Sequence, residues 1–255
     1  MSHYSHSSNN PVVSIITVVY NGADTLERTI KSIIRQTYDA IEYIVVDGGS
    51  KDGTHNIINK YRKNIHKFIS EPDNGLYDAM NKGMQLATGE YLWFINSGDE
   101  VADENILTTI FNQFPKADIY YGDTIITDMQ GHEIGLRRLS PPEQLNWKDF
   151  RHGMVVSHQS VIVRVNICHP YILKYKYSAD YEWVLYALKH SATIINTHLV
   201  LSRFLDGGLT KKNILPGLKE RFNIMTQYFG LLNTIIHHFP IAFKFINFIV
   251  KYKRF

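Results

Sequence analysis

The sequence predicts an α/β fold with a mainly parallel central sheet flanked by helices and a helical extension at the C-terminus. Short apolar segments rich in β-branched residues recur along the first hundred residues, and segments with helical spacing of apolar residues separate them. Strands that alternate with helices form βαβ units with a parallel sheet and right-handed crossovers. Of the 255 residues, 44% are hydrophobic and 20% are charged, which indicates a folded globular chain.

The first predicted strand is Val12–Val19, which is almost wholly apolar and is therefore expected to be buried on both faces. Asn21 and Gly22 then turn the chain. Asp24 or Thr25 can cap the helix that follows. Its apolar positions recur at helical spacing and are Leu26, Ile30, Ile33 and Ile34.

The next elements continue the alternation as far as Ile95. Their predicted ranges are a strand at Ile41–Val46, a helix through Ile57, Ile58 and Tyr61, a short strand at Lys67–Ser70, a helix at Leu76–Ala87 and a buried strand at Tyr91–Ile95. From Asp118 onward the pattern is less regular, and residues 131–160 read as a loop-rich region. A helix is predicted at Ser178–Lys189.

The composition excludes several classes of protein. The formal net charge of +3 is scattered along the chain, so no nucleic-acid partner is indicated. The single cysteine, Cys168, cannot form an intrachain disulfide, and a reducing compartment is therefore permitted. Residues 1–10 lack the apolar core of a signal peptide and are expected to be disordered. These features favour a cytoplasmic location.

Ligands of open parallel sheets gather at the carboxyl ends of the strands. In this sequence that rule selects the residues around Tyr20, Asp47 and Asn96–Asp99, which follow three predicted strands. All three loops are polar, so we expect the functional site at this edge.

Several strings in the first three quarters of the chain resemble family 2 glycosyltransferases with the GT-A fold. They are SIITVVYNGADTLERTIKSIIRQTY, YIVVDGGSKDGT, SEPDNGLYDAMNKGMQLATGEYLWFINSGDE, SHQSVIVR and SADYEW, and they occur in the family's order over roughly residues 12 to 190. Within the family, the versions SEPDNGLYDAMNKG and NSGDE are similar to those of bacterial enzymes that build capsule and exopolysaccharide. The resemblance implies a GT-A domain over residues 11–215 and a C-terminal helical extension over 216–255.

At the nucleotide end, the resemblance implies that Asp47 accepts a hydrogen bond from the base of the donor. The alternative is that Asp47 only caps the turn before Gly48 and Gly49. Thr17, Val19 and Tyr20 are expected to wall the base, with Tyr20 stacking or touching the ribose. For Thr17 and Val19, plain strand packing is the alternative.

The resemblance also implies that the helix carrying Asp78 and Asn81 lines the donor pocket. These residues lie three apart and therefore on one helical face. Many relatives carry Arg where Met80 stands. This chain therefore lacks one cation that is expected near the diphosphate. Lys82 is either a substitute for it or a solvated surface residue.

The family places a metal-binding Asp-x-Asp-Asp string after a buried strand, and the matching residues here are Asn96, Ser97, Gly98 and Asp99. Asp99 is the first candidate for a ligand of Mn²⁺ or Mg²⁺, which favour oxygen ligands and stabilise the departing diphosphate. Asn96 and Ser97 are expected to contact the donor or a metal-bound water. His158, in SHQS, is a second candidate ligand, with a structural role as the alternative.

On the acceptor side, Asp180 in SADYEW matches the family's catalytic carboxylate, and the resemblance implies that it takes the proton of the attacking hydroxyl. Capping of the following helix, shared with Ser178, is the alternative role. Glu182 is the competing base. Several arginines could neutralise phosphate, and the sequence does not choose among Arg137, Arg138, Arg151 and Arg203.

The C-terminal segment Leu218–Phe255 is rich in aromatic and aliphatic residues but is interrupted by His237, His238, Pro240 and Lys244, which makes it a poor candidate for a membrane span. Its basic end, KYKRF, suits peripheral contact with anionic lipid on the inner face of the membrane. Packing against the domain or in a homodimer interface is an equal alternative.

Together these features predict a metal-dependent, inverting glycosyltransferase. We expect it to use a nucleotide-sugar, with a UDP-sugar favoured over a GDP-sugar, and a saccharide or lipid-linked saccharide acceptor of bacterial surface-polysaccharide biosynthesis. One rival is a sugar-phosphate nucleotidyltransferase, which should carry a Gly-rich basic loop where this chain has YNGADTL. The other is a catalytically decayed protein that binds nucleotides or glycans, which the thinned acidic string would allow.

Overall fold

A computed structural model describes residues 10–207 and 213–238 of the chain. The predicted disordered start and the last part of the predicted tail, residues 1–9 and 239–255, lie outside the described residues. The strands are β1 (Val13–Val19), β2 (Ile41–Asp47), β3 (Lys67–Ser70), β4 (Tyr91–Phe94), β5 (Glu100–Val101), β6 (Ile119–Thr127), β7 (Glu133–Leu136), β8 (Val161–Arg164) and β9 (Ile194–Leu205). The α-helices are α1 (Leu26–Ile34), α2 (Thr54–Lys60), α3 (Leu76–Leu86), α4 (Ile106–Gln113), α5 (Ala179–His190) and α7 (Ile214–Phe229). Short 3₁₀ helices are η1 (Arg62–Asn64), η2 (Trp147–His152), η3 (His158–Ser160) and η4 (Val165–Ile167).

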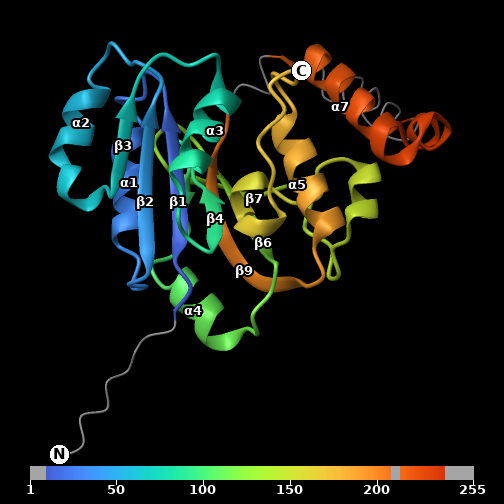
Figure 1. Cartoon of the computed structure of the whole chain (residues 1–255), viewed down its shortest axis with the longest axis horizontal. Helices are drawn as coiled ribbons and strands as arrows, with labels where there is room; N and C mark the ends of the chain where they lie inside the picture. The colour runs from blue at the N-terminus through green and yellow to red at the C-terminus, as the bar shows by residue number, and fades with distance from the viewer. Residues whose placement is uncertain (1–9, 208–212, 239–255) are drawn as a thin grey trace, which may run out of the picture.

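The strands form one mixed sheet in the order β3-β2-β1-β4-β8-β6-β9-β5, with β7 paired to β6 (Figure 1). The first four strands in this order are parallel, as the sequence predicts. β8 reverses the direction, because it is antiparallel to both β4 and β6, and β9 then pairs in parallel with β6. The predicted α/β fold with a mainly parallel sheet is therefore confirmed.

The two faces of β1 explain why its sequence is almost continuously apolar. Ile16 and Val18 face one core cluster together with Met80 of α3, whereas Ile15 and Val19 face a second cluster. Successive side chains of a strand point to opposite faces, so a strand covered on both sides alternates between two cores rather than between core and solvent. Such a strand requires helices on both faces of the sheet to cover it.

The chain approaches itself closely where α3 crosses the sheet. A Cβ atom added at Gly83 would lie 2.5 Å from Cγ2 of Ile16, so only glycine fits there. This close contact lies between the last turn of α3 and the middle of β1. Figure 1 shows α3 over the parallel strands, and α5 and α7 side by side at the other end of the sheet.

Helix α7 packs on the body of the protein. The Glu220 carboxylate accepts hydrogen bonds from the backbone N–H groups of Lys176 and Tyr177, at 2.8 and 2.9 Å. The Ser178 hydroxyl donates to the carbonyl of Gly217 at 3.1 Å, and the Phe229 ring stacks on Trp147 with centroids 5.3 Å apart. Residues 214–229 therefore pack against the rest of the domain.

A buried carboxylate joins the parallel strands to the loop before β4. Glu42 of β2 accepts hydrogen bonds from the hydroxyl of Ser14 and from both the N–H and the hydroxyl of Thr88, and it forms an ion pair with Lys67 at 2.6 Å. Burial alone would raise the pKa of Glu42. The bonds from Lys67, Ser14 and Thr88 outweigh burial and lower the pKa from 4.5 to about 2.

We expect Glu42→Gln to lower the free energy of unfolding at neutral pH by about 1–3 kcal/mol, because it removes a charge-assisted network. The folded pKa lies below the unfolded one. The stabilisation is therefore fully present above pH 4.5 and is lost as the pH falls towards about 2. Urea unfolding should show that the difference in free energy of unfolding between wild type and variant becomes smaller as the pH drops below 4.5.

Glu27→Gln provides the matched control. Hydrogen bonds from Lys60 and Tyr61 also lower the pKa of Glu27 to about 2, but this carboxylate is solvent-exposed, so its pairing should add little to stability. A difference for Glu42→Gln that stayed constant over the acidic range would contradict the proposed ionic origin.

Candidate functional site

The described residues enclose a cavity of about 710 Å³ at the carboxyl ends of β1 and β4. The starts of α3 and α5, the end of β9 and the middle of α7 complete its walls. Seven of the predicted site residues line it, namely Val19, Tyr20, Asn96, Ser97, Asp99, His158 and Asp180. The other four, Thr17, Asp47, Asp78 and Asn81, are not among its lining residues.

Asp99 is the most deeply placed carboxylate of the cavity, with only 4% of its surface exposed. Its Oδ1 accepts a hydrogen bond from the N–H of Leu205 at 3.0 Å, and its Oδ2 accepts one from Nε2 of Gln159 at 2.9 Å. Burial raises the pKa of Asp99 from 3.8 to about 7 against these two bonds. No ion pair within 4.0 Å joins Asp99 to a cation of the described residues, so no positive side chain offsets its charge when the carboxyl is ionised.

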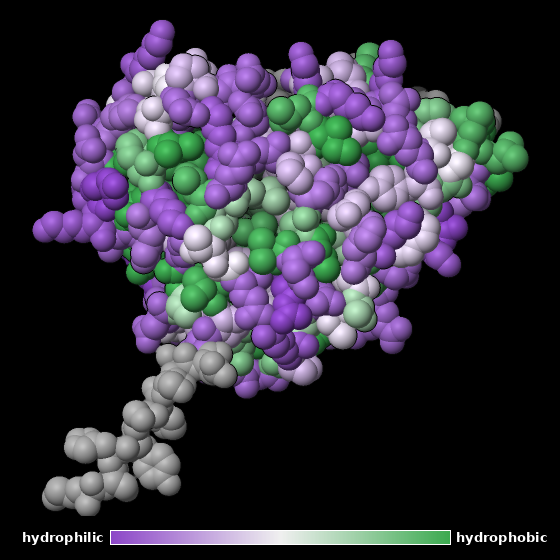
Figure 2. All heavy atoms as spheres, viewed as in Figure 1, coloured by the Kyte–Doolittle hydropathy of each residue, from purple (hydrophilic) through white to green (hydrophobic). Residues whose placement is uncertain are grey.

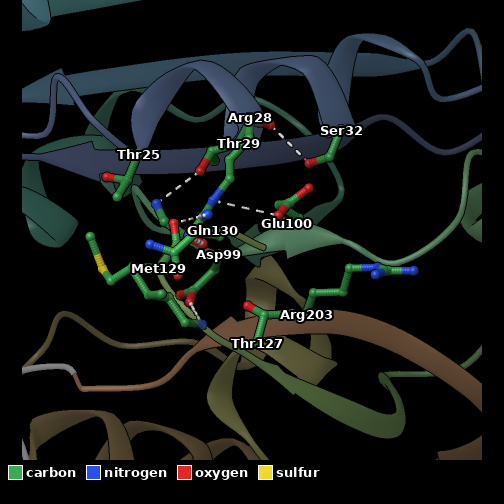
Figure 3. Close-up of polar contacts among 12 residues, drawn as sticks. Thr25, Arg28, Thr29, Ser32, Asp99, Glu100, Thr127, Met129, Gln130 and Arg203 are labelled. Atoms are coloured by element: carbon green, nitrogen blue, oxygen red, sulfur yellow. Dashed lines mark hydrogen bonds and ion pairs between the residues drawn. The ribbon is translucent and has the colours of Figure 1, made fainter. Parts of the chain in front are cut away.

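The turn that carries Asp99 is held from α1 by Arg28 (Figure 3). The Arg28 guanidinium donates to the carbonyls of Gly98 at 3.3 Å and Met129 at 2.8 Å and lies 3.5 Å from the Glu100 carboxylate. Gly98 has a φ of +102°, which favours glycine. Arg28 therefore positions the turn and leaves Asp99 facing the cavity.

Asn96 presents an unsatisfied group beside this carboxylate. Its side-chain oxygen Oδ1 is buried and accepts no hydrogen bond from the described residues. The neighbouring Ser97 hydroxyl lies 3.1 Å from the hydroxyl of Thr25. A buried acceptor without a partner is costly unless a ligand or water fills the place.

The residues around Asp99 fit a cation that also takes ligands from elsewhere. No group of three or more His, Cys, Asp or Glu side chains that could hold a metal occurs in the described ranges. An unneutralised buried carboxylate and the free amide oxygen of Asn96 are oxygen ligands of the kind that Mn²⁺ and Mg²⁺ bind. Such a site would depend on the diphosphate and on water for its remaining ligands.

His158 is placed differently from Asp99. It is buried, and its Nε2 lies 2.6 Å from the hydroxyl of Tyr171. Burial lowers its pKa to about 4, so the ring is neutral at physiological pH. A metal at Nε2 would have to displace the Tyr171 contact, and the ligand role of His158 stays a prediction.

Asp180, the second residue of α5, also lines the cavity. Its Oδ1 accepts hydrogen bonds from the hydroxyl of Tyr77, at 3.0 Å, and from the N–H of Tyr181, at 2.9 Å. Its Oδ2 accepts none from the described residues. The competing base, Glu182, is 3% exposed, accepts a hydrogen bond from Tyr228 and lies outside the cavity. The geometry therefore favours Asp180.

At the expected nucleotide end, Tyr20 is 63% exposed and is available for stacking. Thr17 is fully buried and donates to the carbonyl of Ile95, which agrees with plain strand packing. Asp47 is also fully buried, and its carboxylate accepts from the N–H of Ser50 and the hydroxyl of Ser70. The structure thus gives Asp47 a turn-stabilising role, and base recognition by this residue stays a prediction.

The two residues of α3 predicted to contact the donor make structural contacts. Asn81 exchanges hydrogen bonds with the backbone of Tyr171, donating at 2.9 Å and accepting at 2.7 Å. Asp78 accepts from the N–H of Asn74, and Lys82 pairs with Glu71 at 2.8 Å. Donor contacts of Asp78 and Asn81 stay predictions.

Comparison with known proteins decides the family. The sequence model described as Glycosyl transferase family 2 matches residues 14–172, which is more than half of the chain. The chain belongs to glycosyl transferase family 2. It is thus an enzyme that transfers sugars, which goes against both rival functions.

Among its relatives, an uncharacterized glycosyltransferase of Mycobacterium tuberculosis is 32% identical over 189 residues, covering 69% of each chain. A PGL/p-HBAD biosynthesis glycosyltransferase of Mycobacterium bovis is 28% identical over 239 residues, covering 85% of this chain and 86% of the relative.

Two solved structures share the fold. S. aureus TarS 1-349 has a TM-score of 0.67 at 16% identity, covering 93% of this chain and 74% of TarS. The mannosyltransferase PcManGT from Pyrobaculum calidifontis, in complex with GDP-Man and Mn²⁺, has a TM-score of 0.60 at 14% identity, covering 92% and 76%. The expected GT-A fold of this glycosyltransferase is thereby confirmed.

The sequence analysis missed several residues that shape the site of this family 2 enzyme. Gln159 holds Asp99 and Tyr77 holds Asp180, and these two residues stand inside the strings SHQS and DNGLYDAMN, which offered a signal for both. Arg28 lies on α1, and no feature of the sequence around it indicated a role in the site. Of the four arginines proposed for phosphate, Arg137 lines the cavity, and Arg203 instead pairs with Glu133 and extends away from Asp99 in Figure 3.

We expect Asp99→Asn to raise the melting temperature in EDTA at neutral pH. Asparagine keeps the acceptor for the Leu205 N–H but loses the acceptor for Nε2 of Gln159. It also removes a buried carboxylate that lacks an ion pair, a relief of about 1–3 kcal/mol that we expect to outweigh the lost hydrogen bond. Thermal melts of wild type and variant would measure the change. A lower melting temperature for the variant would mean that the carboxylate stabilises the metal-free fold.

Proposed function

We propose that this enzyme is a metal-dependent, inverting glycosyltransferase that moves a sugar from a nucleotide-sugar to a saccharide or lipid-linked saccharide in bacterial surface-polysaccharide biosynthesis. The observation that carries the proposal is the placement of two dissimilar carboxylates on one cavity. Asp99 is buried without an ion pair, whereas Asp180 has one fixed and one free oxygen.

The proposed donor is a UDP-sugar. The structures of TarS 1-349 with UDP and with UDP-GlcNAc, both at TM-score 0.65, support this choice. PcManGT, which binds GDP-Man with Mn²⁺, makes a GDP-sugar the alternative. The exposed ring of Tyr20 is a surface on which either base could stack.

Asp99 and Asn96 would hold the divalent cation near the diphosphate. When bound, the cation stabilises the negative charge that builds up on the leaving group. The Asp99 carboxylate needs such a partner because burial disfavours its charged form. Gln159 and Arg28 keep the carboxylate and its turn in place.

Asp180 would act on the acceptor. In a single displacement, the acceptor oxygen forms a bond to the anomeric carbon while the bond from that carbon to the diphosphate breaks, which inverts the configuration. The proton of the acceptor hydroxyl passes to Oδ2 of Asp180, and the bonding electrons leave on the diphosphate. Tyr77 fixes the carboxylate through Oδ1, so the free oxygen faces the cavity.

The proposed acceptor class rests on the relative named for PGL/p-HBAD biosynthesis and on one surface feature. Beyond α7, residues 231–238 are helical, and four apolar side chains on them are exposed, namely Leu231, Leu232, Ile235 and Ile236. Figure 2 shows hydrophobic side chains gathered at this end of the molecule. Within the described part of the chain, no helix has the length and apolar character needed to cross a bilayer. We propose that this surface, with the basic end that follows it, contacts anionic lipid peripherally.

The experiment that tests the function is a thermal-shift screen of UDP- and GDP-sugars with and without Mn²⁺. A ligand that binds only the native state stabilises it by about 2.7 kcal/mol at a hundredfold excess over its Kd. For wild type, the nucleotide-sugar should raise the melting temperature more with Mn²⁺ than without it. In Asp99→Asn, this additional increase with Mn²⁺ should be lost. A screen in which no nucleotide-sugar shifts the wild type would reject the proposal.

For the transfer step, we expect Asp180→Asn to lower kcat by about 100- to 10,000-fold while donor affinity stays near wild type. Asparagine keeps the volume and the acceptor for Tyr77 but takes no proton at neutral pH. Initial rates with the donor from the screen would measure the loss. Glu182→Gln is the matched control, since it removes a carboxylate of the same helix outside the cavity. Retained activity in Asp180→Asn with loss in Glu182→Gln would move the base to Glu182.

For the membrane contact, we expect Leu232→Gln combined with Ile236→Gln to reduce sedimentation with anionic liposomes, and deletion of residues 239–255 to reduce it as well. Ile134→Gln, which changes an exposed apolar residue of β7, should bind liposomes like wild type. Unchanged liposome binding in all variants would refute the contact. A dimer in sedimentation velocity that the double substitution dissociates would assign the surface to a second subunit.

A further inference from the structure

Two arginines, Arg137 and Arg221, line the cavity together with Asp180. Arg137 follows β7, and Arg221 lies in the middle of α7, so two segments far apart in the sequence bring these cations to one wall. The proposed transfer mechanism uses neither of them. Asp180 offsets part of the charge of the pair, but two arginines beside one carboxylate leave a net positive charge on this wall. The pair is therefore a candidate site for an anion.

Arg137 is anchored in its place. One guanidinium nitrogen donates to the carbonyl of Leu139 at 3.1 Å, and another donates to the carbonyl of Met154. Burial and the neighbouring Arg221 lower its pKa from 12.5 to about 10, so it remains charged at neutral pH. Arginine has five donors, and these two bonds leave donors on Arg137 for a ligand.

Arg221 is fixed through its helix rather than through its own head group. Its guanidinium lies 5.8 Å from the ring centroid of Tyr181 and makes no hydrogen bond or ion pair with the described residues. The adjacent Glu220 ties α7 to the start of α5, so the backbone under Arg221 is held. The donors of Arg221 are therefore available in a defined position.

The two arginines belong to the Asp180 end of the cavity rather than to the Asp99 end. The cation whose charge acts on Asp99 is Arg28. The Arg221 guanidinium lies 5.8 Å from the ring centroid of Tyr181, the residue that follows Asp180. The charges of Arg221 and Asp180 both act on Arg137, which agrees with this placement. An anion held by this pair would lie beside the incoming acceptor and away from the donor diphosphate.

We propose that Arg137 and Arg221 bind a phosphate group carried by the acceptor, next to the hydroxyl that Asp180 deprotonates. The inference rests on the function proposed above and narrows its acceptor to a phosphorylated saccharide. Planar guanidinium groups match phosphate oxygens with paired hydrogen bonds, which a neutral saccharide does not offer. A lipid-linked glycosyl phosphate and a water-soluble glycosyl phosphate share this chemistry.

The test titrates acceptor analogues into the enzyme saturated with UDP and Mn²⁺, so that the nucleotide occupies the donor diphosphate site. For each of several hexoses, calorimetry compares the 1-phosphate, the dodecyl phosphate ester and the methyl glycoside. Wild type should bind both phosphates at least about tenfold more tightly than the methyl glycoside. Binding of the dodecyl ester alone would identify the lipid-linked form as the source of the phosphate.

Arg221→Gln should abolish this preference without changing UDP affinity or the melting temperature, because the Arg221 guanidinium has no hydrogen bond or ion pair among the described residues that folding would lose. Arg221→Lys should restore part of it, since lysine keeps the charge but loses the paired geometry. Lys219→Gln, which removes an exposed charge from the same helix, is the matched control and should behave like wild type.

Equal binding of phosphates and methyl glycosides, no binding of any of them, or an unchanged preference in Arg221→Gln would overturn the inference. Each of these results leaves the proposed function standing, because UDP binding is measured first. Absence of UDP or GDP binding would instead reject the proposed function.

Discussion

The burial of the Asp99 carboxylate is the constraint on which the site depends. A carboxylate in this position needs its hydrogen bonds from segments that meet only in the folded chain, and Gln159 before β8 and Leu205 at the end of β9 provide them. The antiparallel insertion of β8 between β4 and β6 places Gln159 at that point. Asp99, which follows the parallel strand β4, therefore depends for its hydrogen bonds on residues beside β8 and in β9, in the mixed half of the sheet.

The cavity has an electrostatic order that follows from its walls. At one end lie a buried acid and the unpaired oxygen of Asn96, which together suit a cation. At the other end, Asp180 stands beside two arginines, which suits a proton transfer next to an anion. The two aspartates differ in environment. Asp99 is buried, whereas Asp180 keeps one oxygen without a hydrogen bond from the described residues, so the same side-chain type has different chemical properties at the two positions.

The sequence predicted the parallel half well because its signals are local. Each of β1, β2 and β4 is a run of apolar residues, and the parallel arrangement alone brings Tyr20 and Asn96–Asp99 to one edge. β9 was not located in advance, since Asn196, Thr197 and His198 interrupt its apolar pattern, and His198 has a positive φ of 54°. The contacts of Asn81 with Tyr171, 90 residues away, and the entry of Arg221 into the cavity depend on tertiary packing that no local pattern records.

The position of α7 also limits where the chain can be shortened. A cut after residue 215 would remove the Gly217 carbonyl that receives the Ser178 hydroxyl, the Glu220 carboxylate that receives two backbone N–H groups, and the Tyr228 hydroxyl that donates to buried Glu182. The bond from Ser178 is buried, and a buried polar group left without a partner costs about 1–3 kcal/mol. We therefore expect a chain cut at residue 215 to be less stable than one that keeps α7, whose contacts make it part of the packed body of the protein.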